Sequence, residues 1–198
     1  MSNRISDIIK KSRTEIIEGT FVNLVPFTLV DTDNVIRLRN QNKNRHFLNQ
    51  SYLITADGQA KWYEDYLLRT NDIYWSVYNK QKKFIGTVRV YDIDEDNDIC
   101  DQGSLIIDEE VSAEAPYAIE VEILTLDYIF SVLKIGNVIN EDRADNKVMN
   151  SLTKKLGFKY IKDTVKDGNK YKYYLLNPED YEKNREKFSQ IIDYWMKR

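Results

Sequence analysis

The first part of the chain changes from a helical to an alternating hydrophobic pattern. Isoleucines within residues 5–17, separated by lysine and arginine, predict a short amphipathic helix that Gly19 ends. Apolar and polar residues then alternate over 21–25 and predict a strand that ends at Pro26, because proline cannot donate to a strand ladder. We therefore expect a helical segment before the first strand.

Two helices are expected next, each after a residue whose side chain can cap a helix N-terminus. The first follows Asp31 or Asp33 and ends in a polar run. The second follows Thr55 or Asp57 and covers about residues 60–69, where aromatic and aliphatic side chains recur at helical spacing. Both are predicted to be amphipathic.

The rest of the chain predicts six strands and three helices. Polar turns, KQKK and DGNK, separate two pairs of strands and predict a hairpin at each place. The order is that of an α/β (α+β) layer fold with one mixed central sheet of about six or seven strands flanked by helices. The strands are expected at 73–79, 83–93, 101–108, 138–143, 158–165 and 170–176, and the helices at 117–133, 146–156 and after Pro178.

Length and charge narrow the class of protein. The 198 residues predict one domain, and 29 basic against 32 acidic side chains give a net charge of −3. Nucleic-acid binding is not expected as the main task, because it requires an excess of basic groups. No apolar run approaches the ~18 residues of a membrane span, and the first residues lack the apolar core of a signal peptide. We expect a cytoplasmic protein that binds no membrane.

The residues that usually hold metals or perform nucleophilic catalysis are scarce. One Cys and one His exclude the usual zinc cluster, and the acidic turn at 92–101 lacks the glycine and glutamate of a calcium loop. No metal site is therefore expected. His46 has no serine or cysteine nucleophile suggested beside it, and phosphate-binding glycine fingerprints are absent. The chemistry must rest on other residues.

Four segments carry spacings that belong together. The first segment ends in Arg39-Asn40, and the second contains Trp62. The third covers two consecutive predicted strands, and the fourth places Asn146 eleven residues before Gly157. Together they resemble the GCN5-related N-acetyltransferase (GNAT) superfamily, especially the branch that acetylates ribosomal proteins and amino sugars. The resemblance covers about 18–176 and leaves 1–17 as an N-terminal helical extension and 177–198 as a C-terminal amphipathic helix. The four segments are 19–40, 55–67, 84–108 and 126–158.

The resemblance implies a fold and a chemistry. Two central strands splay apart, and the freed backbone binds acetyl-CoA, the acyl donor. Asp101 holds the position of the base or water relay, and Thr153 that of the tyrosine that protonates the leaving thiolate. The resemblance implies that the splayed strand binds the cofactor through Leu105, Ile106, Ile107 and Asp108, and that Asn146, at the start of the helix over 146–156, contacts the cofactor arm. Arg39, Asn40 and Trp62 are implied on the acceptor side.

Each of these positions also has a simpler interpretation. Asp101 can be the edge of a solvated acidic turn, Asn146 can be a helix N-cap, and Trp62 can be a core residue. The sequence alone leaves these alternatives open.

The loop that binds pyrophosphate in the family departs from its pattern here. It aligns with Ala115, Pro116, Tyr117, Ala118, Ile119 and Glu120, and no glycine occurs between Gly103 and Gly136. Glycines let backbone amides approach a phosphate without a Cβ in the way. Glu120 is expected to place a carboxylate where the anion would lie, and Glu109, Glu110 and Glu114 to add negative charge.

Two functions follow from the sequence. The first is an N-acyltransferase that moves acetyl from acetyl-CoA to a primary amine, on an amino sugar nucleotide, a protein N-terminus or a small amine. The second is a GNAT-fold protein that has lost acetyl-CoA binding and acts as a binding or assembly module, which the glycine-free loop favours. A homodimer through the apolar side of the C-terminal helix is a further alternative, with packing onto its own sheet as the other.

Overall fold

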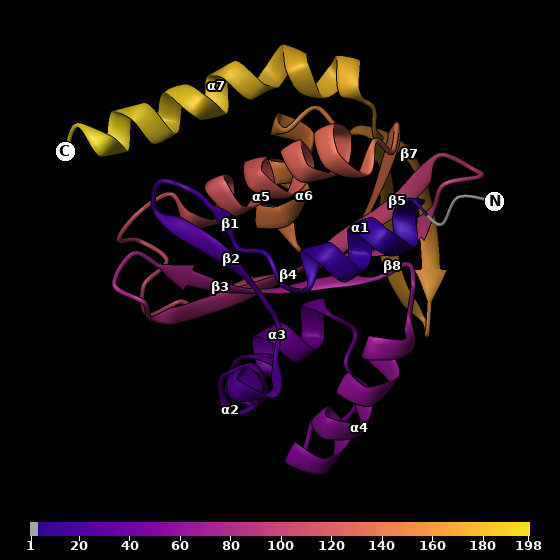
Figure 1. Ribbon diagram of the computed structural model, residues 1–198. Helices are drawn as coiled ribbons and strands as arrows, with labels where there is room; N and C mark the ends of the chain where they lie inside the picture. The colour runs from indigo at the N-terminus through magenta and orange to yellow at the C-terminus, as the bar shows by residue number, and fades with distance from the viewer. Residues whose placement is uncertain (1–3) are drawn as a thin grey trace.

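One eight-stranded sheet with helices on both faces organises the computed structural model, which describes residues 4–198 (Figure 1). The strands are β1 (Ile17–Glu18), β2 (Val22–Pro26), β3 (Ile73–Asn79), β4 (Phe84–Asp94), β5 (Ile99–Ile107), β6 (Asn137–Arg143), β7 (Lys159–Lys166) and β8 (Asn169–Leu176). The helices are α1 (Arg4–Ser12), α2 (Thr32–Arg39), α3 (Asn42–Phe47), α4 (Ala56–Leu68), α5 (Tyr117–Tyr128), α6 (Lys147–Lys155) and α7 (Pro178–Met196).

The sheet order is β1-β2-β3-β4-β5-β6-β8-β7. Among the neighbouring strands of the described residues, β5 and β6 pair in parallel and all the other pairs are antiparallel. The mixed α+β fold and both predicted hairpins, β3–β4 and β7–β8, are confirmed. The strand count exceeds the predicted six or seven because of the two-residue strand β1, which pairs with β2. Its residues lie in a segment whose isoleucines predicted a helix.

The N-terminal helix is shorter than its pattern indicated. α1 ends at Ser12, and Ile17 instead pairs with Leu24 on β2. The Arg13 guanidinium donates hydrogen bonds to the carbonyl oxygens of Tyr66, Leu67, Arg69 and Asp72 and fixes the chain as it leaves the helix. The predicted helix over 5–17 is therefore wrong beyond residue 12, because tertiary contacts outweigh the local pattern.

The sheet is buried on both faces. One core lies between the sheet and α1, α5 and α7 and includes Ile9, Trp75, Leu126 and Phe188. A smaller, more aromatic core lies on the opposite face against α2 and α4, around Phe27, Val35, Leu38, Tyr66 and Tyr74. Figure 1 shows these two groups of helices above and below the sheet.

The predicted caps are confirmed in part. The side chains of Thr55, Asn146 and Asn177 accept hydrogen bonds from backbone N–H groups in the first turns of α4, α6 and α7. Asp31 lies at the N-cap of α2 but makes no cap hydrogen bond. Its carboxylate instead accepts from the hydroxyls of Ser76 and Tyr78 on β3.

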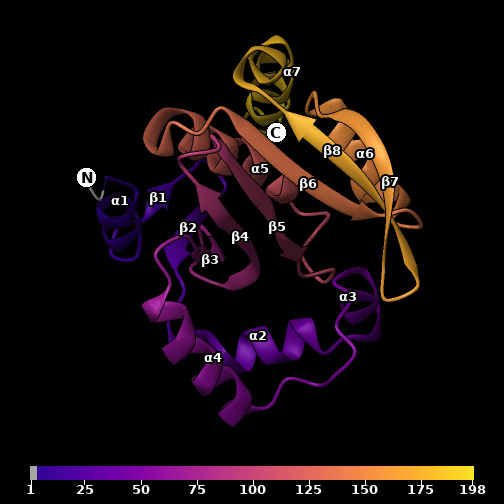
Figure 2. The ribbon, with the colours of Figure 1, turned by 90° about the vertical axis from the view of Figure 1, so that its right-hand side faces the viewer.

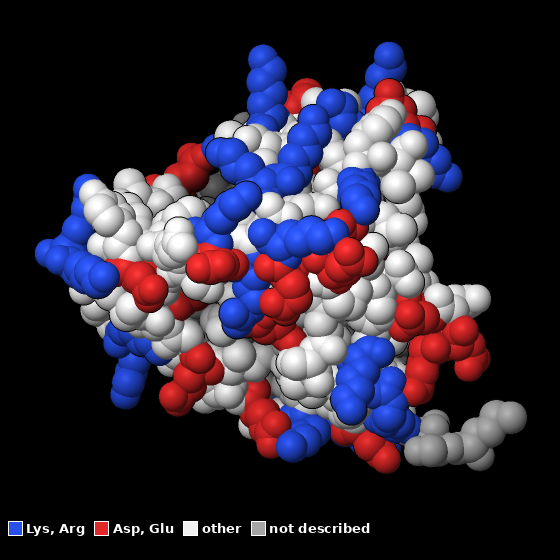
Figure 3. Space-filling view, turned by 90° about the horizontal axis from the view of Figure 1, so that it is seen from above, with Lys and Arg blue, Asp and Glu red and all other residues white. Residues whose placement is uncertain are grey.

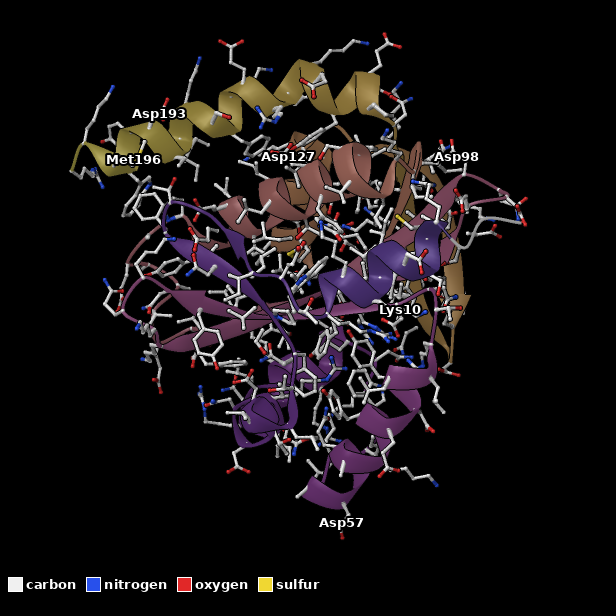
Figure 4. All side chains as sticks on the ribbon, in the orientation of Figure 1. Lys10, Asp57, Asp98, Asp127, Asp193 and Met196 are labelled. Carbon is white, nitrogen blue, oxygen red and sulfur yellow. The ribbon has the colours of Figure 1, made fainter. Side chains whose placement is uncertain are left out.

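The C-terminal helix α7 covers its own domain. Phe188 and Ile192 are buried, and Asp127 of α5 lies beneath α7, where Arg185 donates two hydrogen bonds at 2.8 and 2.7 Å (Figure 4). Basic and acidic side chains are interspersed over the face seen in Figure 3. The apolar side of α7 packs on its own domain, which was one of the two alternatives.

Among residues 4–198, no helix is both long and apolar enough to cross a membrane. The same part of the chain holds no group of three or more His, Cys, Asp or Glu side chains placed to bind a metal ion.

Candidate active site

Two neighbouring strands separate in the middle of the sheet. β5 and β6 pair only through Ile99–Asn137, Cys100–Val138 and Asp101–Ile139. Beyond Asp101, β5 keeps its partner β4 while β6 keeps its partner β8, and the two strands diverge (Figure 2). Their facing backbone edges, from residue 102 on β5 and residue 140 on β6, thus have no strand partner between them.

A β-bulge lies on β5 just after this point. Thr87 pairs with Ile106 and Arg89 with Gly103, so two residues, Ser104 and Leu105, lie opposite one residue of β4. Ser104 has a positive φ of 53°, as a bulge of this kind requires. Beside it, Gly86 approaches the carbonyl oxygen of Ile106 too closely for any Cβ. The bulge reverses which side chains of β5 face each core.

The predicted donor-binding residues of β5 follow the bulge. Leu105 and Ile107 pack against the core under α5, whereas Ile106 is buried in the core under α2 and α4. The backbone N–H of Asp108 is already bound to the carbonyl oxygen of Ile85 at 2.7 Å. Because backbone groups alternate sides along a strand, Asp108 and Ile106 direct theirs toward β4, whereas Leu105 and Ile107 direct theirs toward the divergence.

Asp101 lies where the divergence begins, directly opposite Tyr91 of β4. Partial burial and the neighbouring carboxylates of Asp92 and Glu141 raise the pKa of Asp101 to about 6. The positive charge of Lys166 lowers this pKa, but by less than the other groups raise it. A carboxylate with such a pKa is ionised at neutral pH and can still take up a proton, as a general base requires.

Glu120 does not face the divergence. Its carboxylate accepts hydrogen bonds from the backbone N–H groups of Thr20, Phe21 and Val22, at 2.5, 2.7 and 2.8 Å. The side chain is buried, 4% exposed, against the turn between β1 and β2. The prediction that Glu120 places its charge where an anion would bind is therefore wrong.

Helix α5 begins beside the splayed strands, with Pro116 at its N-cap. Ala115, Pro116 and Tyr117 are buried, while Ala118 and Ile119 are half-buried. Among the described hydrogen bonds, none has the N–H of Ala118 or Ile119 as donor to a residue before the helix. These amides point out of the helix N-terminus, the end that favours anions.

Two acidic side chains near this helix end are paired with basic ones. Asp108 is 2% exposed, and its carboxylate binds the Arg37 guanidinium at 2.7 Å. Glu109 forms an ion pair with Lys43 of α3. Glu110 and Glu114 are exposed to solvent. The negative charge expected from the sequence is thus partly neutralised by α2 and α3.

Thr153 and Asn146 take structural positions on α6. The hydroxyl of Thr153 is fully buried, donates to Asp142 at 2.7 Å and accepts from Asn140 at 3.1 Å. Its one proton is therefore engaged. Asn146 caps α6 by accepting from Met149 N–H at 3.2 Å, which agrees with the simpler of its two interpretations.

A pocket of about 260 Å³ opens on the face of the sheet that carries α2 and α4. Arg39 and Trp62 line it, as the resemblance implied. Asn40 does not, but its amide binds both backbone groups of Ile54, at 2.9 and 2.8 Å, and so holds the loop that forms the rim. The remaining lining residues are Val35, Tyr52, Leu53, Ile54, Thr55, Gly58, Gln59, Tyr74 and Arg89.

Sequence reasoning missed Tyr74 and Arg89. They are register partners on β3 and β4, and Arg89 also stacks over Tyr91, the partner of Asp101. The pocket and Asp101 are thereby linked across the sheet. Strand alternation indicates which residues of one strand share a face of the sheet. It cannot indicate that Tyr74 and Arg89 lie opposite each other on two paired strands.

A second, buried polar cluster joins β5, α5 and β6. Glu122 is 2% exposed and accepts from Gln102 at 2.7 Å, while Oε1 of Gln102 has no hydrogen-bond partner among the described residues. Burial, together with the charge of Asp142, raises the pKa of Glu122 to about 8. A protonated Glu122 therefore suits this position and offers a donor to the unpaired oxygen.

This cluster predicts a pH dependence of stability. Because the folded pKa of Glu122 exceeds its ordinary 4.5, the folded state holds the extra proton. That contribution is complete below pH 4.5 and is lost as the pH rises to about 8. In urea unfolding at pH 5 and 8.5, Glu122→Gln is expected to gain stability relative to wild type as the pH rises. The exposed control, Glu186→Gln, should change little, and a constant difference at all pH values would refute the prediction.

The sequence profile of the acetyltransferase (GNAT) domain family matches residues 22–159. No curated protein sequence matches the chain.

Three solved structures illustrate the structural likeness. A GCN5-related N-acetyltransferase from Brucella melitensis is 18% identical, with a TM-score of 0.74, covering 89% of this chain and 84% of that one. Apo FdhC, described as a nucleotide-linked sugar GNAT, is 22% identical, with a TM-score of 0.75, covering 90% and 98%. Spermidine N-acetyltransferase from Vibrio cholerae, in complex with CoA and spermine, is 17% identical, with a TM-score of 0.76, covering 82% and 99%. At these identities the likeness is one of fold.

Proposed function

Because the chain belongs to the GNAT acetyltransferase family, we propose that it transfers an acetyl group from acetyl-CoA to a primary amine. The observation that carries the proposal is the divergence of β5 and β6, with Asp101 at its start and a pocket on the adjoining face. The acceptor classes are an amino sugar nucleotide, a protein N-terminus and a small amine, which accords with the ribosomal-protein and amino-sugar branch.

The residues around the divergence fit acetyl-CoA. The unpaired edge of β5 beyond Asp101 offers backbone groups to an extended pantetheine arm. The N–H groups of Ala118 and Ile119 at the start of α5 suit a pyrophosphate. With the Glu120 carboxylate bound to the turn between β1 and β2, that carboxylate no longer implies repulsion of the phosphates.

Acetyl-CoA supplies the acetyl group as an activated thioester. Asp101 accepts the proton that the acceptor amine must lose before it can attack, directly or through a water molecule. The backbone N–H groups of the bulge at Ser104–Leu105 are candidates to polarise the thioester carbonyl. The buried Thr153 hydroxyl is bound to Asp142 and is poorly placed to donate a proton to the leaving thiolate.

The alternative is a GNAT-fold protein that does not bind acetyl-CoA and serves as a binding or assembly module. The absence of glycine between Gly103 and Gly136 favours it, since Ala118 places a methyl group at the helix end. The two proposals differ in one measurable property, the affinity for acetyl-CoA.

Isothermal titration calorimetry with acetyl-CoA tests the proposal. We expect micromolar to millimolar binding and a rise in melting temperature that grows with ligand concentration. Ala118→Asp should weaken binding by about tenfold or more, because it repels phosphate, while stabilising the start of α5. The control Gln190→Glu adds the same charge on an exposed part of α7 and should leave binding unchanged. A wild-type protein that gives no heat and no melting shift would favour the alternative.

A further inference from the structure

The pocket lined by Arg39 and Trp62 carries positive charge that no lining side chain balances. Two of its lining residues are arginines, and none of its lining residues, all within the described chain, is acidic. The Arg89 charge is compensated, since its guanidinium binds the buried Asp72 carboxylate at 2.8 and 2.5 Å, as Arg69 also does at 2.9 Å. The single Asp72 carboxylate thus already binds two arginines, Arg69 and Arg89, and leaves no negative charge to pair with Arg39.

Arg39 has no acidic partner within 4.0 Å among the described residues. Its one described hydrogen bond runs from Nε to Oε1 of Gln50 at 3.3 Å, which leaves both terminal nitrogens without a described partner. Arg39 as a whole is half-buried at the edge of the pocket. Such a planar fork matches the two oxygens of a carboxylate or phosphate.

A second, independent feature points to a ligand in the same pocket. Tyr74 is 3% exposed and lines the pocket, yet its hydroxyl has no hydrogen-bond partner among the described residues. A buried hydroxyl without a partner is costly and rare, and a bound ligand with an acceptor oxygen would satisfy it. Trp62 supplies an apolar wall, packed edge-on against Tyr74 at 5.4 Å between ring centroids.

We propose that the amine acceptor carries an anionic oxygen group, a phosphate ester or a carboxylate, which Arg39 binds in this pocket with a hydrogen bond from Tyr74. The proposal rests on the proposed function and specifies its substrate class. It places polyamines among the poor acceptors, because their charges repel the guanidinium that an anion would neutralise.

Matched pairs of amines test the proposal by calorimetry without acetyl-CoA, so that binding is measured apart from turnover. The phosphate pair is glucosamine 6-phosphate and glucosamine, and the carboxylate pair is glycylglycine and its C-terminal amide. Spermidine is the cationic probe. We expect the anionic member of one pair to bind about tenfold or more tightly than its neutral partner, and the pair that responds identifies the source of the anion.

Variants assign the preference to the pocket. Arg39→Gln should reduce the anionic-to-neutral ratio to about one, and Arg39→Lys should restore part of it. Tyr74→Phe should weaken binding of the anionic member without lowering the urea midpoint, because the Tyr74 hydroxyl has no hydrogen-bond partner among residues 4–198. Lys61→Gln, on the exposed side of α4, removes one charge outside the pocket and should keep the ratio.

Three results would overturn the proposal: tighter binding of spermidine, a ratio unchanged in Arg39→Gln, or no binding of either anionic amine at millimolar concentration. The acetyl-CoA titration tests the proposed function independently of these amine-binding measurements. A protein that binds the anionic amine but not acetyl-CoA would retain the anion site in the pocket but would not be an acetyltransferase.

Discussion

Replacing Glu120 with alanine is expected to lower the free energy of unfolding by about 3–4 kcal/mol. The carboxylate accepts hydrogen bonds from three consecutive backbone N–H groups, of Thr20, Phe21 and Val22. Alanine leaves these partly buried donors without an acceptor, and it also frees the turn that brings β1 to β2. Urea unfolding followed by circular dichroism measures the effect as a lower midpoint with an unchanged slope.

The matched control is Glu114→Ala, which removes an exposed glutamate from the loop before α5 and should change stability by less than about 0.5 kcal/mol. Glu120→Gln should fall between the two, because its amide keeps one acceptor oxygen but turns an NH₂ toward backbone donors. If Glu120→Ala instead unfolds at the wild-type midpoint and binds acetyl-CoA more tightly, the carboxylate faces the cofactor after all.

Replacing Asp101 with asparagine is expected to lower kcat/KM by about 10²–10⁴-fold, the usual contribution of a general base. In the wild type, kcat/KM should rise with pH through about 6, because Asp101 accepts a proton only in its ionised form and its pKa is raised to about 6. The measurement is thiol release from acetyl-CoA between pH 5 and 8, with an amine that binds in the calorimetric panel.

Asp92→Asn separates the titration of Asp101 from a general effect on the site. The Asp92 carboxylate is one cause of the raised pKa of Asp101, so its removal should shift the rising limb of the profile to lower pH. The plateau rate should stay near that of the wild type. A flat wild-type profile, or an Asp101→Asn variant with full activity, would show that another group or solvent takes the proton.

The local pattern of the chain predicted most elements, because their signals lie within a few residues. The alternation in β3 and β4, the turn residues of both hairpins, the Thr55 cap and Pro178 at the start of α7 are all local. The wrong helix prediction at residues 13–17 has a non-local cause. There, the Arg13 guanidinium binds four carbonyl oxygens between residues 66 and 72, and Ile17 joins a strand ladder.

The candidate site divides in the same way. The family resemblance implied roles for Arg39 and Trp62, which line the pocket, and for Asp101, which lies where β5 leaves β6. It could not find Tyr74 or Arg89, because their juxtaposition depends on the register between two strands. It also put Thr153 at the position of the proton-donating tyrosine, although the Thr153 hydroxyl is buried and bound to Asn140 and Asp142.

The sequence by itself determined the family and most of the order of elements, and the resemblance named Asp101, Arg39 and Trp62 as candidate site residues. Only the tertiary structure decided where Glu120 points, because a glutamate in the first turn of a helix can face solvent, a ligand or another strand with the same local pattern. The amides of residues 20–22 lie about one hundred positions away in the chain, and folding brings them to that carboxylate. The physical reason is that hydrophobic periodicity specifies which face of an element is buried, whereas a charge is positioned by the distant polar group that satisfies it.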